Sequence, residues 1–261
     1  MLAWQRQELI LDQVRARGAA RVSDLVESLG VSDMTVRRDI ESLARRGLVS
    51  RVHGGATSVA PRSAEEPGFA AKSSLRTDQK DAIARAAAAL VEPGASVAVS
   101  GGTTTYAVAR ELRAAPDLTV VTNSVPVADL LHRERALNHG RGGPAVVLTG
   151  GERTPSDALV GPVAVAALRT LHVDWLFLGA HGVDARAGFT TPNLVEAETN
   201  RALIASARRV VVTVDSSKWG VVGLSSMARL DEVDVLVTDD GLDAEAARLL
   251  RSKVGRLVVA G

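Results

Sequence analysis

The chain has 261 residues, of which 46% are hydrophobic and 23% are charged. This length accommodates one or two domains with a sizeable core, and the composition is that of an ordinary globular protein. The formal net charge is only +1, so any basic surface that meets nucleic acid has to be local. The chain contains no cysteine, which excludes disulfides and a thiolate nucleophile.

The N-terminal stretch MLAWQRQELILDQ contains acidic and polar side chains and does not resemble a signal peptide. No apolar run approaches the roughly 20 residues that a membrane-spanning helix needs. The five histidines fall at no spacing typical of metal ligands. We therefore expect a cytoplasmic protein that needs no membrane, metal or cofactor.

Local composition divides the chain into three parts. Residues 1–57 contain short helical segments that end at glycines. Residues 58–74 mix proline, serine, glycine and charge, which is typical of a linker. In residues 75–261 short β-branched segments alternate with alanine-rich helical ones, which predicts βαβ units.

Three helices are predicted in the first part. The first ends at Gly18, and its apolar residues Leu9, Ile10 and Val14 lie on one helical face. Ser23 is positioned to cap the second, DLVESL, which ends at Gly30. Ser32 is positioned to cap the third, from Asp33 to Arg46, which stops at Gly47.

The third helix has two distinct faces. Its core positions, at i, i+4 and i+7, are Val36, Ile40 and Leu43. The opposite face and its shoulders present Met34, Arg38, Glu41, Thr35 and Arg37. Two helices joined by a short glycine turn, the second with threonine and arginine near its start, form a helix-turn-helix.

Charge and the following residues support DNA binding. From Thr35 to Arg51 five arginines face two acids, which gives a local charge of +3. Arginine reads guanine or binds phosphate, and threonine binds phosphate or contacts a thymine methyl. The segment LVSRV-HGGA-TSV predicts a two-stranded wing that turns at Gly54-Gly55, with Arg51 and His53 near the DNA. A turn-stabilising role for His53 stays an equal alternative.

Residues 31–56, VSDMTVRRDIESLARRGLVSRVHGGA, resemble the DNA-binding signature of the DeoR family of bacterial regulators without interruption. The DNA contacts that this resemblance implies are Ser32, Thr35, Arg37, Arg38, Arg51 and His53. The resemblance also implies that the protein's partner is a double-stranded DNA operator. Because helix-turn-helix proteins read paired half-sites, we also expect a homo-oligomer, either a dimer or a tetramer.

The third part is predicted to be an open, mostly parallel α/β sheet, so the fold class is α/β with an N-terminal winged helix-turn-helix. Near-continuous apolar strands such as VVVTV and WLFLGA indicate a sheet covered on both faces. The predicted strands are Ser96–Ser100, Leu118–Thr122, Ala145–Thr149, Val173–Gly179, Val210–Asp215, Val233–Thr238 and Leu257–Ala260. The predicted helices include Asp78–Val91, Thr104–Ala114, Ala158–Leu168, Leu194–Ala207 and Ala244–Lys253.

Polar residues follow the predicted strands. After the first comes SGGTTT, whose glycines allow close backbone approach at a helix N-terminus that attracts phosphate. It is neither a Walker A loop nor GxGxxG, which disfavours a nucleotide. Further polar clusters follow other strands at 122–124, 149–152, 179–182 and 215–218. Since parallel strands bind ligands at their carboxyl ends, these clusters predict a binding site, the alternative being that each is only a polar turn.

From Lys80 to the C-terminus the chain is similar to the DeoR-family sensor domain, whose fold is similar to ribose-5-phosphate isomerase and the CoA transferases. The matching pieces are Lys80 with IAxxA, Gly102-Thr103-Thr104, Thr122-Asn123, Gly150-Gly151, FLGAHGV at 177–183, Glu196 and DSSK at 215–218. The effector contacts that the resemblance implies are Lys80, Gly102, Thr103, Thr104, Asn123, His181, Glu196 and Lys218. The glycine and threonines would surround a sugar phosphate, the lysines would balance its charge, and the others would meet its hydroxyls. The family usually has aspartate where this chain has Ser100, which leaves the sugar open.

The sequence leaves two alternative functions to compare, a transcription regulator and a sugar-phosphate isomerase. The resemblance implies a non-enzymatic regulator, a repressor of sugar or carbohydrate metabolism genes that a phosphorylated sugar effector releases from its operator. The alternative is a sugar-phosphate isomerase with a DNA-binding extension, in which Glu196 or His181 would be the base. The paired acids and lysine-glycine loop of the isomerases are not evident. A hydrolase is disfavoured because the chain lacks a GxSxG elbow.

Overall fold

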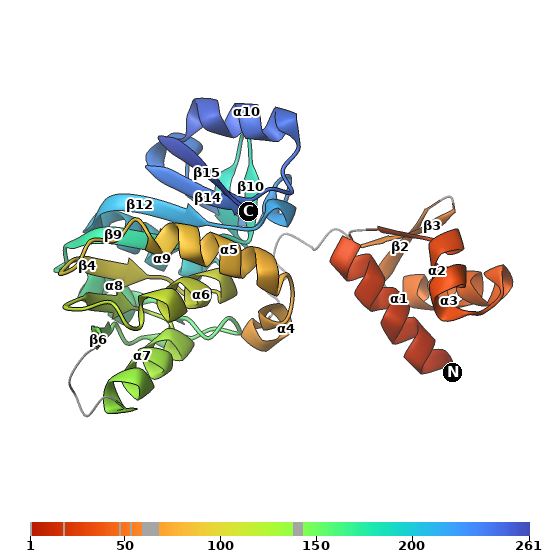
Figure 1. The fold of residues 1–261 in the computed structure, drawn as a ribbon, viewed down its shortest axis with the longest axis horizontal. Helices are drawn as coiled ribbons and strands as arrows, with labels where there is room; N and C mark the ends of the chain where they lie inside the picture. Colours follow the sequence, from red (N-terminus) through yellow and green to blue (C-terminus); the bar gives the residue numbers. More distant parts are fainter. Residues whose placement is uncertain (1, 18, 47, 53, 59–67, 138–142) are drawn as a thin grey trace. The chain divides into compact units, whose positions relative to one another are not determined.

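The computed structural model describes residues 2–17, 19–46, 48–52, 54–58, 68–137 and 143–261. The chain divides into two compact units, residues 1–61 and 62–261 (Figure 1). Within the described ranges no helix combines the length and apolar character needed to cross a bilayer.

The described part of the first unit has three helices and a small antiparallel sheet (Figure 1). The helices are α1 (Ala3–Arg17), α2 (Val22–Leu29) and α3 (Asp33–Arg45). The strands, in the sheet order β1-β3-β2, are β1 (Ala19–Arg21), β3 (Gly55–Ser58) and β2 (Val49–Val52). The predicted wing hairpin is present, but the prediction of two strands was wrong because β1 adds a third alongside β3.

The turn between α2 and α3 follows from two local signals. Gly30 adopts a left-handed conformation, with φ of 64°, and ends α2. Ser32 caps α3, as predicted, since its side chain accepts a hydrogen bond from the Thr35 amide at 3.3 Å. The predicted cap at Ser23 was wrong. Strand β1 runs directly into α2, so this helix begins at Val22, whose amide donates to the Gly54 carbonyl at 2.8 Å.

The core of the first unit lies between its three helices and the sheet. Val36, Ile40 and Leu43 are buried, as predicted. Leu9, predicted to share a face with Ile10 and Val14, is 43% exposed, and Leu11 is buried in the core with 8% exposure. The other buried residues of α1 and α2 are Ile10, Val14, Val22, Leu25 and Leu29.

A buried carboxylate links α1 to α3. Asp39 lies in the same stripe of α3 as the apolar core residues and is only 5% exposed. Its two oxygens accept hydrogen bonds from Arg6 Nε at 2.8 Å and Gln7 Nε2 at 3.0 Å. A buried charge is tolerated only when it is paired and hydrogen-bonded, so this contact stabilises the angle at which α3 is held.

The second unit is built on a seven-stranded sheet in which every neighbouring pair is parallel (Figure 1). Each of the seven predicted strands is present in it. In sheet order the strands are β15 (Arg256–Ala260), β14 (Val235–Asp239), β12 (Ala207–Thr213), β9 (Val173–Leu178), β4 (Ser96–Val99), β5 (Thr119–Thr122) and β6 (Ala145–Leu148). The sheet is therefore parallel throughout, a stricter arrangement than the predicted one.

Helices cover both faces of this sheet, as the apolar strands predicted. One face packs against α5 (Thr77–Ala88), α6 (Thr103–Leu112) and α7 (Val125–Leu137). The other packs against α8 (Pro162–Leu168), α9 (Leu194–Ser206) and α10 (Ala244–Lys253). Residues of both layers are fully buried, for example Ile83 of α5 and Leu203 of α9.

Several short elements depart from the predictions. Helix α8 starts later than expected because Leu159–Val160 forms β8, which pairs with β7 (Glu152–Arg153). A separate antiparallel sheet contains β10 (Gly182–Asp184), β11 (Gly188–Thr191) and β13 (Ser225–Ala228). The described residues of this unit also form two 3-10 turns, η1 (Ser216–Lys218) and η2 (Leu230–Glu232).

The end of the predicted linker is folded. Helix α4 (Phe69–Ser73) lies inside the stretch assigned to residues 58–74. The Phe69 ring meets Tyr106 edge-on with centroids 5.7 Å apart, and the Phe69 amide donates to the Pro155 carbonyl at 3.1 Å. These contacts make α4 part of the second unit, so the linker prediction extended too far toward the C-terminus.

We predict that Asp39→Ala lowers the free energy of unfolding of the first unit by about 1–3 kcal/mol, because it leaves Arg6 and Gln7 without their shared acceptor. Urea denaturation of the full chain, followed by circular dichroism, measures the loss. Glu41→Ala, on the exposed face of the same helix, is the matched control and should stay within about 0.5 kcal/mol of the parent protein. Equal stability of the two variants would contradict the structural role of Asp39.

Candidate functional site

The outward face of α3 is the first candidate site. Met34 is 69% exposed there, and Arg37 and Arg38 are also exposed. Ser32 and Thr35 lie at the start of the helix, where their hydroxyl oxygens are 2.9 Å apart in a hydrogen bond. The structure thus places four of the predicted DNA contacts on the first two turns of one helix. This is the end of a recognition helix that contacts bases in helix-turn-helix proteins.

The two neighbouring arginines of α3 differ in their surroundings. Arg37 forms an ion pair one turn back with Asp33, and its Nη2 donates to Asp33 Oδ2 at 3.2 Å. This hydrogen bond lowers the pKa of Asp33 and raises the pKa of Arg37. Both groups are exposed, so the pair adds little to stability and leaves Arg37 able to exchange Asp33 for a phosphate. For Arg38 the described residues provide no ion-pair partner within 4.0 Å.

The wing contributes one described residue to this site. Arg51 is exposed on β2, opposite Ala56 of β3. Gly54 has a φ of 82°, which favours glycine in the tight turn of the hairpin. His53, the other predicted wing contact, lies outside the described residues.

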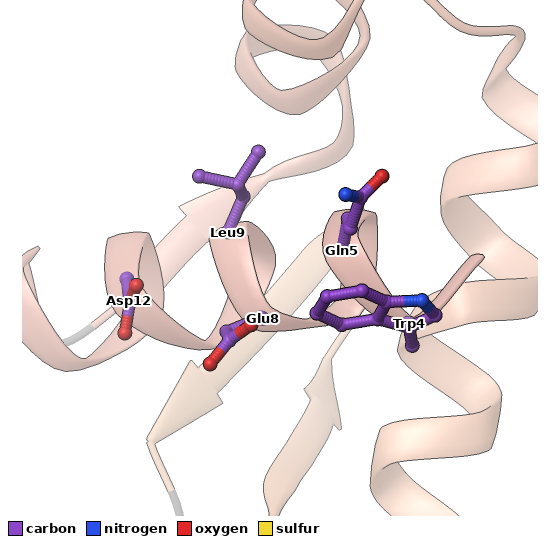
Figure 2. Close-up of a pocket in the computed structure, with 5 residues that line it drawn as sticks. All are labelled: Trp4, Gln5, Glu8, Leu9 and Asp12. Carbon is purple, nitrogen blue, oxygen red and sulfur yellow. The ribbon is translucent and has the colours of Figure 1, made fainter. Parts of the chain in front are cut away.

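A hollow on α1 is unsuited to DNA. Figure 2 shows its lining, Trp4, Gln5, Glu8, Leu9 and Asp12, all from α1. The Trp4 side chain, which lines this hollow, is 61% exposed. Two carboxylates in this hollow would repel the phosphate backbone, so we assign DNA binding to α3 and the wing and not to this part of α1.

The carboxyl edge of the parallel sheet is the second candidate site. Gly102 precedes α6 with φ of 148°, a conformation that favours glycine. A Cβ on Gly101 would lie 2.6 Å from the Ala158 Cβ, so that position has no room for a side chain. Thr103 and Thr104 form the first turn of α6, where free backbone N–H groups and hydroxyls suit an anion.

Asn123 has a different role from the predicted one. It is fully buried, its Oδ1 accepts from the Gly101 amide at 3.0 Å, and its Nδ2 donates to the Leu159 carbonyl at 3.0 Å. The side chain therefore holds the glycine loop in place and does not face a ligand. Ser100 has a similar role, since its hydroxyl accepts from the Gly179 amide at 3.1 Å and so links the ends of β4 and β9.

A cation is buried near the end of β12. Lys80 of α5 is 6% exposed, and its Nζ donates to the Lys72 carbonyl at 2.6 Å. Burial lowers the pKa of Lys80 to about 8; Asp215 opposes this shift, while Lys218, Lys72 and Arg76 add to it. The structure therefore brings the two predicted lysines, Lys80 and Lys218, together. It adds Lys72 and Arg76, which our sequence reasoning missed although they are spaced four residues apart before Lys80.

The two remaining predicted effector contacts, His181 and Glu196, both form hydrogen bonds with residues of β11. His181 follows β9, and its amide donates to the Thr190 carbonyl at 3.0 Å. Glu196 lies in the first turn of α9, where its Oε2 accepts from the Thr191 hydroxyl at 3.0 Å. Both are only partly buried. Across the described ranges, no group of three or more histidine or acidic side chains is arranged to hold a metal ion.

Comparison with known proteins identifies both units. Residues 6–62 match the DeoR-like helix-turn-helix domain, and residues 75–240 match the DeoR C terminal sensor domain. The chain is 33% identical to a putative aga operon transcriptional repressor of Escherichia coli O157:H7, over 98% of this chain and 94% of that one. It is 32% identical to a lactose phosphotransferase system repressor of Staphylococcus epidermidis, over 97% and 98% of the two chains. A solved ribose 5-phosphate isomerase A from Methanocaldococcus jannaschii aligns with 54% of each chain, at 20% identity and a TM-score of 0.40.

These matches define a helix-turn-helix transcription regulator with a sensor domain. The chain belongs to the DeoR family. Membership favours the regulator over the isomerase alternative, because both of these relatives are named as repressors.

We predict that Lys80 makes stability depend on pH. Its pKa is about 8 in the folded protein against an ordinary 10.5, so between these values the unfolded chain binds more protons. The contribution of neutral Lys80 to the free energy of unfolding is therefore fully present above pH 10.5. It is lost as the pH falls through about 8, where Lys80 becomes protonated in the folded protein. Urea denaturation should show the parent protein gaining stability relative to Lys80→Met as pH rises from about 7 to about 9.5. Lys253→Met, an exposed lysine of α10, is the control; a pH-independent difference between parent and Lys80→Met would contradict the assignment.

Proposed function

We propose that the chain is a repressor of a sugar-related operon and that a phosphorylated sugar releases it from DNA. The observation that supports this most directly is a glycine-threonine loop and a buried lysine at the carboxyl edge of one sheet, in a chain with a helix-turn-helix unit. A phosphate is the ligand class that both features suit. The two repressors of sugar-related operons that are similar along nearly the whole chain support the same function.

The proposed DNA contacts are Ser32, Thr35, Arg37, Arg38, Arg51 and His53. Among the described residues, Arg38 is the best placed to contact a base or a phosphate. It is exposed, and no described residue forms an ion pair with it that would first have to break. Arg37 would first leave Asp33. The hydroxyls of Ser32 and Thr35 would bind the backbone near the N-terminus of α3. We further propose that the protein acts in the cytoplasm as a homodimer or homotetramer, since paired half-sites need paired helices.

The proposed effector contacts lie along the sheet edge. Gly102, Thr103 and Thr104 would surround the phosphate, and Lys80 and Lys218 would balance its charge. His181 and Glu196 would meet the sugar hydroxyls, as partly buried groups that can donate and accept. Asn123 would act indirectly by holding Gly101. Coupling of about 1–3 kcal/mol between the two sites would change operator affinity roughly 5- to 150-fold.

Two variants separate the sites. Arg38→Ala should lower affinity for a labelled fragment of the neighbouring promoter by about 5- to 150-fold at constant salt, because it removes one base or phosphate contact. It should leave the affinity for sugar phosphate unchanged. Lys218→Ala should retain DNA affinity and lose its response to a sugar phosphate. Fluorescence anisotropy of the labelled DNA measures both effects.

Arg248→Ala, an exposed arginine of α10, is the charge-matched control and should behave like the parent protein. Parent-like DNA binding by Arg38→Ala would contradict the assignment of α3 as the recognition helix. A parent-like effector response by Lys218→Ala would remove this lysine from the site.

A further inference from the structure

Large aliphatic side chains are exposed where α8 and α9 begin. Leu194 and Val195, in the first turn of α9, are 61% and 43% exposed, and Val163 of α8 is 63% exposed. The two helices meet at this end, since a Cβ on Gly161 would lie 3.7 Å from Val195 Cγ1. Apolar side chains that gather on a surface mark an interaction site, whereas single ones do not. The outward-facing residues that we call the α8–α9 face are Val163, Leu194, Val195, Glu198, Arg201 and Ala205.

The exposed stripe of α9 continues with two opposite charges. Glu198, Arg201 and Ala205 follow Leu194 at helical spacing, on the side of α9 that faces away from the sheet, and all are exposed. Arg201 Nη1 donates to the Ser226 carbonyl at 2.6 Å, a partner that carries no net charge. Within the described ranges neither Glu198 nor Arg201 forms an ion pair within 4.0 Å. This face therefore offers both an acid and a base to a partner.

The order of these residues along α9 is complementary to itself. Leu194 lies four residues before Glu198, and Ala205 lies four residues after Arg201. When two copies of a helix pack antiparallel about a twofold axis, each residue faces the one at the same distance from the axis in the other copy. With the axis midway between Glu198 and Arg201, each of these charges faces its opposite in the second copy. Each Leu194 then faces the small Ala205, which leaves room for the leucine.

A loop of the small antiparallel sheet adds to the apolar end of this face. Val222 and Leu224 are 45% and 50% exposed. Gly223, between them, lies against the segment that leads into α9, because a Cβ there would be 2.6 Å from the Thr191 carbonyl carbon. The loop therefore lies at the same end of α9 as Leu194. A central apolar area with charged groups beside it is the usual composition of a protein–protein interface.

We propose that the α8–α9 face is the surface through which two copies of the chain associate about a twofold axis, with their α9 helices antiparallel. This inference rests on the proposed function, in which paired half-sites need two helix-turn-helix units. Glu196, a proposed effector contact, belongs to the same first turn of α9 as Leu194 and Val195. A sugar phosphate that contacts Glu196 would therefore bind to a helix that also contacts the second copy.

Charge reversal tests the antiparallel register. Sedimentation equilibrium of the full chain, without DNA or sugar, measures the association constant between copies. Glu198→Arg and Arg201→Glu each place like charges opposite one another at two symmetric positions, so each should weaken association about tenfold or more. Both substitutions in one chain restore opposite charges and should bring the association constant back close to the parent value. Glu92→Arg, an exposed acid outside the α8–α9 face, is the control and should associate like the parent protein.

Leu194→Glu tests the apolar part of the same face. A carboxylate in the first turn of a helix suits the helix dipole, so this variant should keep the parent melting temperature in circular dichroism. Its association should be about tenfold weaker or worse, because a charge would be buried between the copies. Leu137→Glu, at a leucine of α7 that is 77% exposed, is the matched control and should associate like the parent protein.

The outcomes distinguish this inference from the proposed function. Parent-like association of Leu194→Glu and of both single charge reversals would overturn the inference and leave the proposed function intact. Failure of the double reversal to regain association would overturn the antiparallel register. A parent protein that stays monomeric at every concentration would overturn the inference together with the expected homo-oligomer. Release of promoter DNA by a sugar phosphate is measured separately, by fluorescence anisotropy.

Discussion

The parallel pairing of β9 with both β4 and β12 is the constraint on which the proposed ligand site depends. Because parallel strands all end at the same edge, the loops after these three strands are brought together although they are far apart in the sequence. The Ser100 hydroxyl accepts from the Gly179 amide, which fixes the β4 and β9 loops against each other. Arg76 and Lys80, from the start of α5, approach Asp215 at the end of β12. The site is therefore a property of the sheet and not of any one motif.

Each unit contains a buried charged side chain, and the surroundings of the two side chains differ. In the first unit Asp39 is paired with Arg6 and accepts a hydrogen bond from Gln7, and these contacts link α3 to α1. In the second unit Lys80 is buried among further cations, and burial lowers its pKa to about 8. A buried charge that is paired within the chain stabilises the fold, whereas a buried lysine with a lowered pKa is typical of a functional site. This contrast is the physical basis for assigning structure to one and recognition to the other.

Sequence patterns predicted most of the helices and strands, because their formation depends on local sequence signals. Apolar β-branched runs are sufficient to locate the seven strands, and the Ser32 cap followed by an apolar stripe is sufficient to locate α3. What could not be predicted depends on contacts between distant segments. Strand β1 has only three residues and exists through its pairing with β3. Asn123 follows a strand like a ligand contact, yet its partners are Gly101 and Leu159. Lys72 lies in a stretch with linker composition that folds because Phe69 packs on Tyr106.

In the proposed mechanism, occupancy of the sheet edge by a sugar phosphate weakens operator binding. Its most direct test is to titrate phosphorylated sugars, and the same sugars without phosphate, into the complex of the full chain with a labelled promoter fragment at constant salt. We predict that at least one sugar phosphate releases the DNA, with a change in affinity of roughly 5- to 150-fold, and that its unphosphorylated parent does not. Equal release by the parent sugar, or no release by any sugar phosphate, would contradict the account.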